Sequence, residues 1–545
     1  MKQAMKLPVK LPVKLTSTAL GLCVTAAVLA GCGGGDDPSG SGPDAGGDVV
    51  DGGTFTLGVS SDPGNLDPQM SAGSALFMVT QFAYDPLVSV DGETGEIKSA
   101  LATSWETEGE TTTLTLGEGI TCADGTELTA TDVADNLNFV ADPANKSPFL
   151  GTFLPAGSSA EADDTARTVT LTLKSPAPFV LNGLASLPIV CPSGLADREA
   201  LAQGTAGTGP YALTEAAPGD HYTYQIREGY TWGPDGATTA TEGMPDTVVV
   251  QVVENESTAA NLLLSGGLNA AQIAGPDAVR LEKSGLFYAE TPALAGEQWY
   301  NHAEGRVTSD PAVRMALTQA LDLAELQQVI TAEQGGPATV LAVNEPVSCP
   351  GDSVSGALPP HDPDAAAQLL DDAGWTRDGD GVRTKDGRPL EVVFLYQNNL
   401  GSSGDAAAEL TVQQWREVGV DATARAQNEG TLTGTIFGAG DWDVAWVSLN
   451  VNSPDQLVPF LSGPAAPDGT NFSAIDDPAY EAAVQEAMAL PGTEGCDAWL
   501  EAEAGLIANA DIVPFANSMV RTFGAKAQFE TPGQLVPTSI RMMAK

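Results

Sequence analysis

The chain has 545 residues, 42% of them hydrophobic, which is enough for a large core and indicates two or more domains. Its formal net charge of −47 at pH 7 gives a surface that repels nucleic acids and anionic lipid headgroups, so both are excluded as partners. No long acidic block stands out as a dedicated cation site, and the charge therefore indicates a solvated surface that keeps the protein soluble.

The N-terminus has the layout of a secretory signal peptide. Four lysines precede an apolar run over residues 15–29, which ends in Leu29-Ala30-Gly31-Cys32. A run of about 15 residues is short for a bilayer span, which needs about 20. The ending resembles a bacterial lipoprotein signal, in which the cysteine becomes the lipid-bearing N-terminus. We predict removal of residues 1–31 and lipidation of Cys32, with an ordinary signal peptide or an uncleaved membrane anchor as the alternatives.

Residues 32–53 are rich in Gly, Ser, Pro and Asp and offer almost nothing to bury, which predicts a flexible tether. A flexible segment of about 21 residues spans roughly 25 Å. The folded body would thus stand off the membrane, outside the cytoplasm.

The first part of the folded body mixes strands and helices. Alternating apolar residues predict strands over 54–59, 111–116 and 168–173. Between the last two strands, Thr129 and Asp132 resemble a capping box at the start of a helix.

The second part continues the same mixture. A strand over 246–253 precedes a helix that Gly266-Gly267 ends, and a short strand over 268–273 follows. Asp-Pro pairs, which suit the first residues of a helix, predict three further helices, beginning at Asp310-Pro311, Asp362-Pro363 and Asp477-Pro478. The predicted fold class is α/β.

A series of short motifs runs along the chain in a fixed order: Asn65-Leu66-Asp67-Pro68, Tyr84-Asp85-Pro86-Leu87, Leu101-Ala102-Thr103-Ser104-Trp105-Glu106, Thr129-Ala130-Thr131-Asp132-Val133, Gly207-Thr208-Gly209-Pro210-Tyr211 and Pro311-Ala312-Val313-Arg314-Met315-Ala316-Leu317. Together they resemble the signature of family 5 extracellular solute-binding proteins, the dipeptide- and oligopeptide-binding components of ABC importers. The resemblance covers the chain from about residue 54 to its end.

The resemblance implies a two-lobed periplasmic-binding-protein-like fold of class II, in the large family 5 variant, with a ligand cleft between the lobes. Lobe I would comprise residues 54–290, lobe II residues 291–511, and residues 512–545 would return to lobe I. Two chain crossings would then form a hinge. We expect a monomer that works with an ABC permease and ATPase complex.

The sequence departs from the family pattern after Trp446. Peptide-binding members often place an aspartate a few residues beyond this tryptophan to hold the ammonium group of the peptide, whereas Val447-Ser448-Leu449-Asn450 contains no acid. A buried ammonium without a counter-charge is costly. Unless Asp455 or another acid substitutes, the solute would not be a peptide with a free amine.

Four cysteines remain after the signal and the lipidation site are set aside, and four cysteines allow three disulfide pairings. The lobes that the resemblance implies favour Cys122–Cys191 and Cys349–Cys496, because each pair then closes within one lobe. A metal site is the alternative, but the chain has no Cys-x-x-Cys and only three histidines.

Residue type and the resemblance together suggest which side chains line the cleft. Small residues let the backbone approach a ligand, amides donate hydrogen bonds, and aromatic rings stack on a peptide side chain or a sugar. For the tryptophans, a place in the core is the alternative. The predicted ligand-binding residues are Ser71, Gly73, Trp299, Asn301, Gln397, Trp442, Trp446 and Asn450.

No motif of catalysis is present: the chain lacks a Gly-x-Ser-x-Gly elbow and a phosphate-binding loop. We therefore predict a non-enzymatic, lipid-anchored receptor that captures a solute, in the first place an oligopeptide, and that needs neither a cofactor nor a metal. An oligosaccharide or other non-peptide solute is the alternative within the same class. A secreted hydrolase and a surface adhesion or signalling protein are the alternatives outside it.

Overall fold

A ten-stranded mixed sheet carries the fold of the computed structural model, which describes residues 47–544 apart from 72, 93, 275 and 380. The predicted signal peptide and Cys32 lie outside the described residues. In sheet order the strands are β16 (Asp421–Gln427), β15 (Glu391–Gln397), β17 (Val444–Trp446), β12 (Phe287–Tyr300), β18 (Ile512–Gly524), β11 (Ala270–Ile273), β1 (Thr54–Val59), β10 (Thr247–Val252), β9 (His221–Ile226) and β8 (Tyr211–Ala217).

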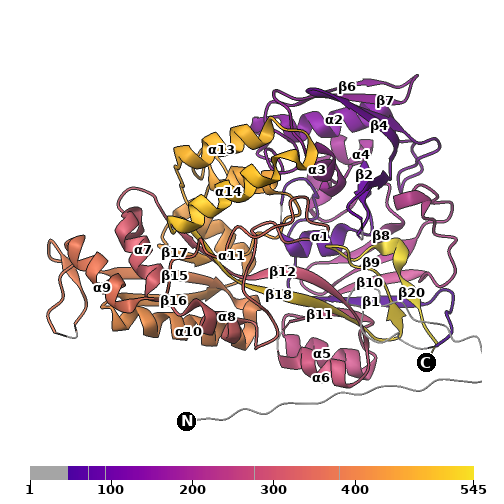
Figure 1. Cartoon of the computed structure of the whole chain (residues 1–545). Helices are drawn as coiled ribbons and strands as arrows, with labels where there is room; N and C mark the ends of the chain where they lie inside the picture. Colours follow the sequence, from indigo (N-terminus) through magenta and orange to yellow (C-terminus); the bar gives the residue numbers. More distant parts are fainter. Residues whose placement is uncertain (1–46, 72, 93, 275, 380, 545) are drawn as a thin grey trace, which may run out of the picture. The chain divides into compact units, whose positions relative to one another are not determined.

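Helices lie on both faces of this sheet (Figure 1). On one face lie α5 (Glu256–Ser265), α6 (Pro276–Lys283), α8 (Leu323–Ile330) and α10 (Gly401–Glu417). Helix α7 (Pro311–Gln319) shares a hydrophobic cluster with α8 and α10. On the other face lie α1 (Ser74–Thr80), α11 (Glu429–Gly434), α13 (Pro478–Met488) and α14 (Cys496–Ala508). The remaining helices are α3 (Val180–Ser186), α4 (Pro192–Ala196), α9 (Pro363–Asp372) and α12 (Val458–Leu461).

A second, antiparallel sheet belongs to the first third of the chain. Its strands, in sheet order, are β4 (Ala102–Glu108), β5 (Thr111–Leu116), β7 (Thr168–Thr172) and β6 (Ser159–Asp163), and helix α2 (Ala130–Ala141) packs on it. Three two-stranded pairs complete the strands: β2 (Val88–Val90) with β3 (Ile97–Ser99), β13 (Thr384–Lys385) with β14 (Arg388–Pro389), and β19 (Ala527–Gln528) with β20 (Arg541–Met542). The predicted α/β class is confirmed.

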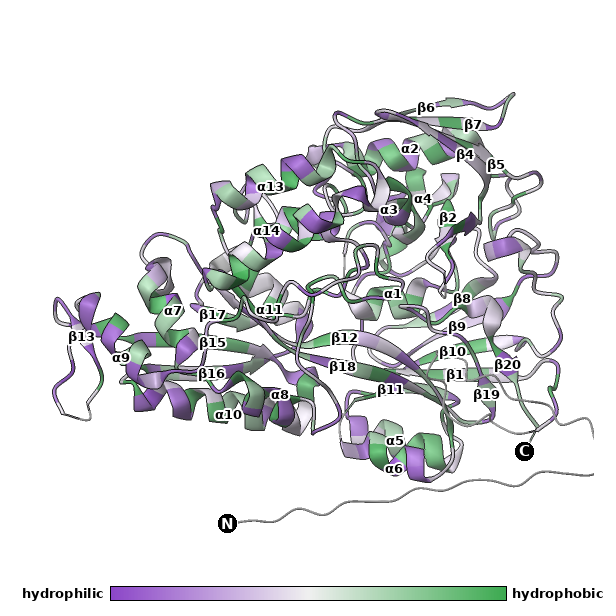
Figure 2. Ribbon diagram, in the orientation of Figure 1, coloured by the Kyte–Doolittle hydropathy of each residue, from purple (hydrophilic) through white to green (hydrophobic). Residues whose placement is uncertain are grey.

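The local signals of the sequence act as predicted at several helix ends. The side chains of Asp310, Asp362 and Asp477 each accept a backbone hydrogen bond at the start of their helices. Thr129 and Asp132 form both bonds of the capping box of α2. Hydrophobic and hydrophilic residues alternate along α5 and α10, as expected for helices that cover a sheet (Figure 2).

The two longest strands, β12 and β18, form the centre of the large sheet. They pair antiparallel from Phe287 opposite Gly524 to Trp299 opposite Ile512. Strand β11 joins β18 at one end of this ribbon, and β17 joins β12 at the other end. The stretch Thr291–Leu294 pairs with Asn517–Val520 between these ends. The ribbon therefore links the strands of the predicted lobe I to those of the predicted lobe II.

The pairing of β12 with β18 is irregular at one place. Its register shifts between Leu294 and Gly296 and again between Gly296 and Glu297. A side chain at Gly296 would put a Cβ atom 2.4 Å from the Phe515 ring, so the close packing here requires glycine. We call residues 294–297 the β12 bulge.

Both predicted disulfides are present. Cys122 is bonded to Cys191 and Cys349 to Cys496, with S–S distances of 2.04 and 2.03 Å. The first pair joins the loop after β5 to the start of α4, and the second joins the segment around residue 349 to the start of α14.

The end of the predicted tether is part of the folded body. Val50 N–H donates to the carbonyl of Met542, Gly52 N–H donates to that of Met244, and Asp51 accepts from Gly243 N–H. Composition alone extended the tether to residue 53, but these backbone bonds fix its last residues. Residues 50–52 therefore belong to the folded body, which their composition did not predict.

Among the described residues, no helix combines the length and the apolar character that crossing a membrane would require.

Candidate functional site

The segment that follows β17, residues 447–452, is held against β12 by side chains, and we call it the 447–452 loop. Trp299 donates its indole N–H to the carbonyl of Val447 at 2.8 Å. Leu449 N–H donates to Oε2 of Glu297 at 2.8 Å, and Leu294 N–H donates to Oδ1 of Asn450 at 2.7 Å. The loop is thus tied to both ends of the β12 bulge.

Glu297, the acid that bonds the 447–452 loop, was not among the predicted site residues. Its side chain is buried, with 1% of the residue exposed, and Oε1 accepts no hydrogen bond. Burial raises the pKa of Glu297 to about 8, against the opposing effect of the N–H groups of Leu449 and Trp299. Near neutral pH it is therefore an uncharged carboxylic acid and supplies no counter-charge to the loop.

Asp455, the acid that the sequence offered as a substitute, is half-buried and accepts a hydrogen bond from the Ser453 hydroxyl. Burial raises the pKa of Asp455 to about 6. It forms no ion pair within the described part of the chain, so it lies near the loop without a cation of the protein to neutralise it.

The three predicted tryptophans are core side chains in this conformation, which is the alternative that their residue type left open. Trp299 and Trp442 pack on Phe472, with ring centroids 4.8 and 6.1 Å apart. Trp446 packs edge-on against Phe394 at 4.8 Å and donates its indole N–H to Gln298. No more than 2% of any of the three is exposed, so stacking on a solute stays a prediction that would require the core to open.

The loop before α1 contacts α11 through an acid that the sequence analysis had missed. Ser74 donates its N–H to Oε1 of Glu429 at 3.1 Å and its hydroxyl to Oε2 at 3.5 Å. A Cβ atom on Gly73 would lie 3.1 Å from Oε1 of Glu429, and Ser71 accepts from Gly73 N–H. The predicted small residues do allow a close approach, and in this conformation Glu429 is the group that makes it.

Asn301 and Gln397, two of the three predicted amide residues, have different surroundings. Asn301 is 3% exposed and bonded to backbone groups on both sides, donating to the Trp442 carbonyl and accepting from Ala303 N–H. Those bonds give it a structural role here. Gln397 ends β15 and is half-buried, which keeps its amide available to a ligand.

The predicted lobes also meet at two other places. Asn182 of lobe I donates to the Ser348 hydroxyl of lobe II at 3.4 Å. Phe179, at the start of α3, is 4% exposed and belongs to the same hydrophobic cluster as Leu457 and Leu461 of lobe II. Together with the bond between Ser74 of α1 and Glu429, these contacts show that the two parts of the chain touch one another.

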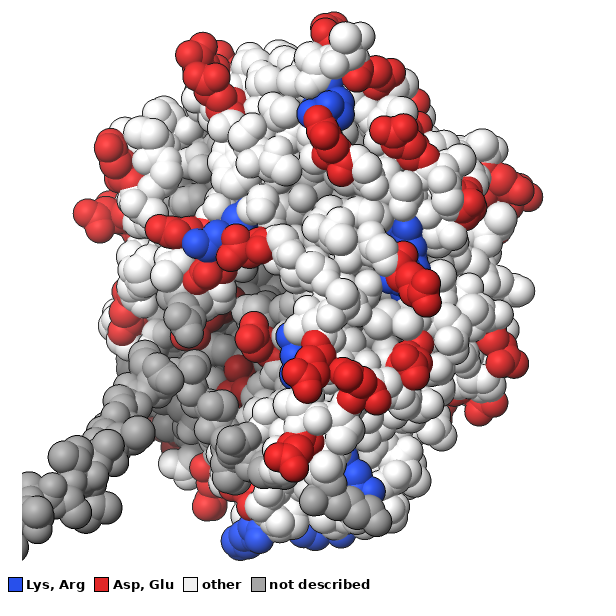
Figure 3. Space-filling view, turned by 90° about the vertical axis from the view of Figure 1, so that its right-hand side faces the viewer, with Lys and Arg blue, Asp and Glu red and all other residues white. Residues whose placement is uncertain are grey.

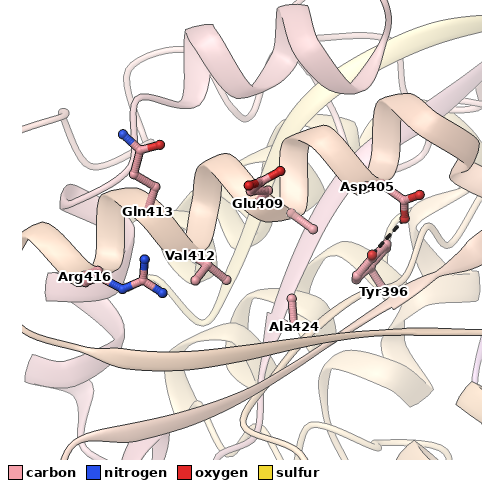
Figure 4. A pocket seen from close by; sticks show the side chains of 8 residues that line it. Tyr396, Asp405, Glu409, Val412, Gln413, Arg416 and Ala424 are labelled. Atoms are coloured by element: carbon pink, nitrogen blue, oxygen red, sulfur yellow. Dashed lines mark hydrogen bonds between the residues drawn. The ribbon is translucent and has the colours of Figure 1, made fainter.

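A surface hollow of about 420 Å³ lies elsewhere, between α10 and the strands β15 and β16 (Figure 4). The Tyr396 hydroxyl donates to Asp405 at 2.8 Å along its wall. None of the predicted ligand-binding residues lines it; its lining is Tyr396, Asp405, Ala408, Glu409, Val412, Gln413, Arg416 and Ala424.

Charged side chains are spread rather than gathered on one face of the molecule. On the face shown in Figure 3, acidic residues are scattered and several of the basic ones adjoin an acid. Within the described residues, no group of three or more His, Cys, Asp or Glu side chains is arranged to hold a metal ion.

The family model of the bacterial extracellular solute-binding proteins, family 5 Middle, matches residues 96–467. Protein XP55 of Streptomyces lividans is 29% identical over 457 residues, covering 80% of this chain and 79% of its own. The glutathione-binding protein GsiB of Escherichia coli K12 is 28% identical over 396 residues, covering 70% of this chain and 71% of its own.

Solved structures agree with this match. A substrate-binding protein from Microbacterium hydrocarbonoxydans, solved with 4-hydroxybenzoate hydrazide, has 29% identity and a TM-score of 0.78, covering 90% of this chain and 100% of its own. The oligopeptide-binding protein AppA of Bacillus subtilis, solved with a nonapeptide, has 18% identity and a TM-score of 0.75, covering 91% and 100%, and shows the same fold. The resemblance read from the motifs is confirmed, and the chain belongs to the family 5 extracellular solute-binding proteins of ABC importers.

Proposed function

We propose that the mature protein is anchored to the membrane by a lipid on Cys32 and captures a peptide-like solute between lobe I (54–290 with 512–545) and lobe II (291–511). The closed, solute-bound form then docks on an ABC permease. The observation that carries this proposal is the β12–β18 ribbon, because strands of the predicted lobe I join one of its ends and strands of the predicted lobe II join the other.

A ribbon of two strands bends more easily than a wide sheet with helices on both faces. The stretch Thr291–Leu294 and its partner Asn517–Val520 form such a ribbon, and the β12 bulge adjoins it. Bending here would open and close the space between the lobes, and a solute would favour the closed form by its higher affinity for that form.

The surroundings of the cleft support a solute that carries no ammonium group at the 447–452 loop. The acid beside this loop, Glu297, is uncharged near neutral pH, and Leu449 and Asn450 offer no charge. Half-buried Glu429, beside Gly73 and Ser74, is the carboxylate better placed to meet a cationic group. We propose that Ser71, Gly73, Gln397, Asn450 and Glu429 lie closest to the solute.

Relatives bind solutes of several kinds. GsiB is named for glutathione, AppA was solved with a nonapeptide and the Microbacterium protein with an aromatic hydrazide. The uncharged acid at the loop supports a second candidate, a neutral non-peptide solute, because it leaves a free amine without a counter-charge at that place.

Thermal unfolding of the purified full chain tests the proposal, with glutathione, a nonapeptide, the same nonapeptide acetylated at its amine, 4-hydroxybenzoate hydrazide and an oligosaccharide. A ligand at 100 times its Kd stabilises the native state by about 2.7 kcal/mol, which raises the midpoint measurably. A rise with a peptide supports the peptide-like solute. A rise with the hydrazide or the oligosaccharide alone favours the non-peptide candidate, and no rise with any of them contradicts the proposed capture.

The lipid anchor has its own test, which does not depend on the solute. Replacing Cys32→Ser should move the protein from the membrane fraction to the soluble fraction of cells that export it. Retention of the variant in the membrane fraction would show that residues 1–31 act as an uncleaved anchor instead.

A further inference from the structure

Two side chains join the 447–452 loop to the β12 bulge in opposite directions. Glu297 belongs to the bulge and accepts from Leu449 N–H of the loop at 2.8 Å. Asn450 belongs to the loop and accepts from Leu294 N–H of the bulge at 2.7 Å. The bulge is where the register of the ribbon shifts, so the loop is bonded to the irregular part of the crossing between the lobes.

Each bond gives a hydrogen-bond acceptor to a backbone N–H group. Leu294 is the last residue of β12 paired with β18 before the register shifts, and Leu449 lies beyond the last pair of β17. A backbone N–H buried without a partner destabilises the folded state, so each side chain holds its segment in place by satisfying one such group.

The surroundings of Glu297 favour a neutral carboxyl over an ionised one. Pro514 of β18 lies opposite it, the loop contributes Leu449, and Glu503 of α14 is the titratable group whose charge acts on it. No Lys, Arg or His pairs with Glu297 within the described residues, and its Oε1 lacks a partner. A neutral carboxyl fits this place, whereas an ionised one would be a buried charge without a cation.

We propose that Glu297 and Asn450 are positioning residues, which hold the 447–452 loop on the β12 bulge so that solute affinity at this loop depends on both bonds. The inference rests on the proposed function, since it assumes that the solute lies against this loop. It goes beyond that proposal because it assigns Asn450, predicted as a ligand residue, to the anchoring of the loop, and adds Glu297 as its counterpart.

The protonation state of Glu297 makes the stability of the anchor depend on pH. The pKa of Glu297 is raised to about 8 by burial, so its neutral form dominates below that pH and a buried charge forms above it. The folded arrangement of the anchor should be destabilised as the pH rises from 7 to 9, because the cost of burying the charge exceeds the gain from a stronger bond with Leu449 N–H. The pKa of Glu503 is raised to about 7, so Glu503 ionises at a lower pH than Glu297. Its negative charge then opposes the ionisation of Glu297.

Hydrogen–deuterium exchange of the full chain tests the anchor without a ligand, in peptides that cover 290–298 and 446–452. Glu297→Leu should speed exchange in the second peptide at least tenfold, and Asn450→Leu should do so in the first. Glu297→Gln and Asn450→Asp keep an acceptor oxygen and should retain protection. Glu409→Gln, the same substitution at an exposed acid of α10, is the control and should leave both peptides unchanged.

The affinity for 4-hydroxybenzoate hydrazide and for the acetylated nonapeptide, measured by calorimetry at pH 7, 8 and 9, completes the test. We expect a loss of about tenfold in Glu297→Leu, and a fall of wild-type affinity with pH that Glu297→Gln abolishes. Unchanged exchange in Glu297→Leu, unchanged affinity in that variant, or a pH dependence that persists in Glu297→Gln would overturn the proposal. If no probe binds the wild type, the proposed function fails, while the exchange data still decide whether the anchor exists.

Discussion

Two buried carboxyls near the proposed site are accommodated in different ways. In the loop before α1, Asp67 is paired with Arg198, whose guanidinium donates to both carboxylate oxygens at 2.5 and 3.0 Å. At the β12 bulge, Glu297 has a backbone donor but no cation among the described residues. The first is held as an ion pair and the second as a neutral acid with its pKa raised to about 8.

The difference shows how each wall of the proposed cleft depends on pH. The wall that carries Ser71 and Gly73 is held by a paired charge, since Arg198 donates to both carboxylate oxygens of Asp67. The wall at the 447–452 loop depends on a proton. Glu503, buried with hydrogen bonds from Ser353 and Leu341 and its pKa raised to about 7, extends this dependence into α14.

The largest expected effect comes from breaking the ion pair. Arg198→Met would leave the Asp67 carboxylate buried without its cation, with only the Gln69 N–H bond remaining, and should lower the free energy of unfolding by about 3–5 kcal/mol. Urea denaturation at pH 7 measures it. The control is Arg167→Met, which removes an exposed pair with Glu118 and should cost less than about 1 kcal/mol. Equal losses in the two variants would contradict the comparison.

Next in size is the effect of removing the proton at Glu297. Its folded pKa of about 8 exceeds the ordinary value of 4.5, so between these values the folded state retains a proton that the unfolded state releases. The contribution of Glu297 to the free energy of unfolding is therefore fully present below about pH 4.5 and is lost as the pH rises towards 8. Glu297→Gln should lack this loss, which amounts to about 3 kcal/mol between pH 5 and pH 8. Urea denaturation across this range, with Glu409→Gln at an exposed acid of α10 as control, would refute the prediction if the two variants gave the same slope.

A smaller effect is expected for Glu503→Gln, because the pKa of Glu503 is raised only to about 7 and its stability loss ends at a lower pH. Since the charge of Glu503 raises the pKa of Glu297, the double variant should gain less than the sum of the single variants. A double-mutant cycle at pH 8 measures this coupling. Strict additivity would mean that the two carboxyls do not sense one another.

The smallest effect concerns the contact between the two walls. Glu429→Ala removes the acceptor of the Ser74 N–H and should lower the free energy of unfolding by about 0.5–1 kcal/mol, since the contact is partly exposed. It should also increase the radius of gyration in small-angle X-ray scattering, because a bond between the lobes is lost. Glu409→Ala, an exposed acid on α10, is the control and should change neither quantity.

Local signals made much of the fold predictable. The period-two stretches became β1 and β5 with the predicted bounds, and the Asp-Pro pairs cap α7, α9 and α13. These outcomes depend on a few neighbouring residues. The disulfide pairs followed from the lobes that the motifs implied.

The site was less predictable because its geometry depends on contacts distant in sequence. Trp442 and Trp446 look like stacking residues by type, yet Phe472 and Phe394 enclose them in the core. Glu297 lies 152 positions from Leu449, and no local pattern marks a bulge that brings them together. Glu429 gave a weak signal, as the acid that follows the capping residue Asn428.

The Cys349–Cys496 disulfide bears on when the site forms. The segment before it supports the 447–452 loop, because Asn344 N–H donates to Val451 and Ser348 N–H donates to Asn452. The disulfide joins that segment covalently to α14. Disulfides form in oxidising compartments and seldom in the reducing cytosol. The covalent support of the loop would thus be completed only after export to an oxidising compartment. A newly made chain inside the cell would then bind solutes more weakly than the exported chain.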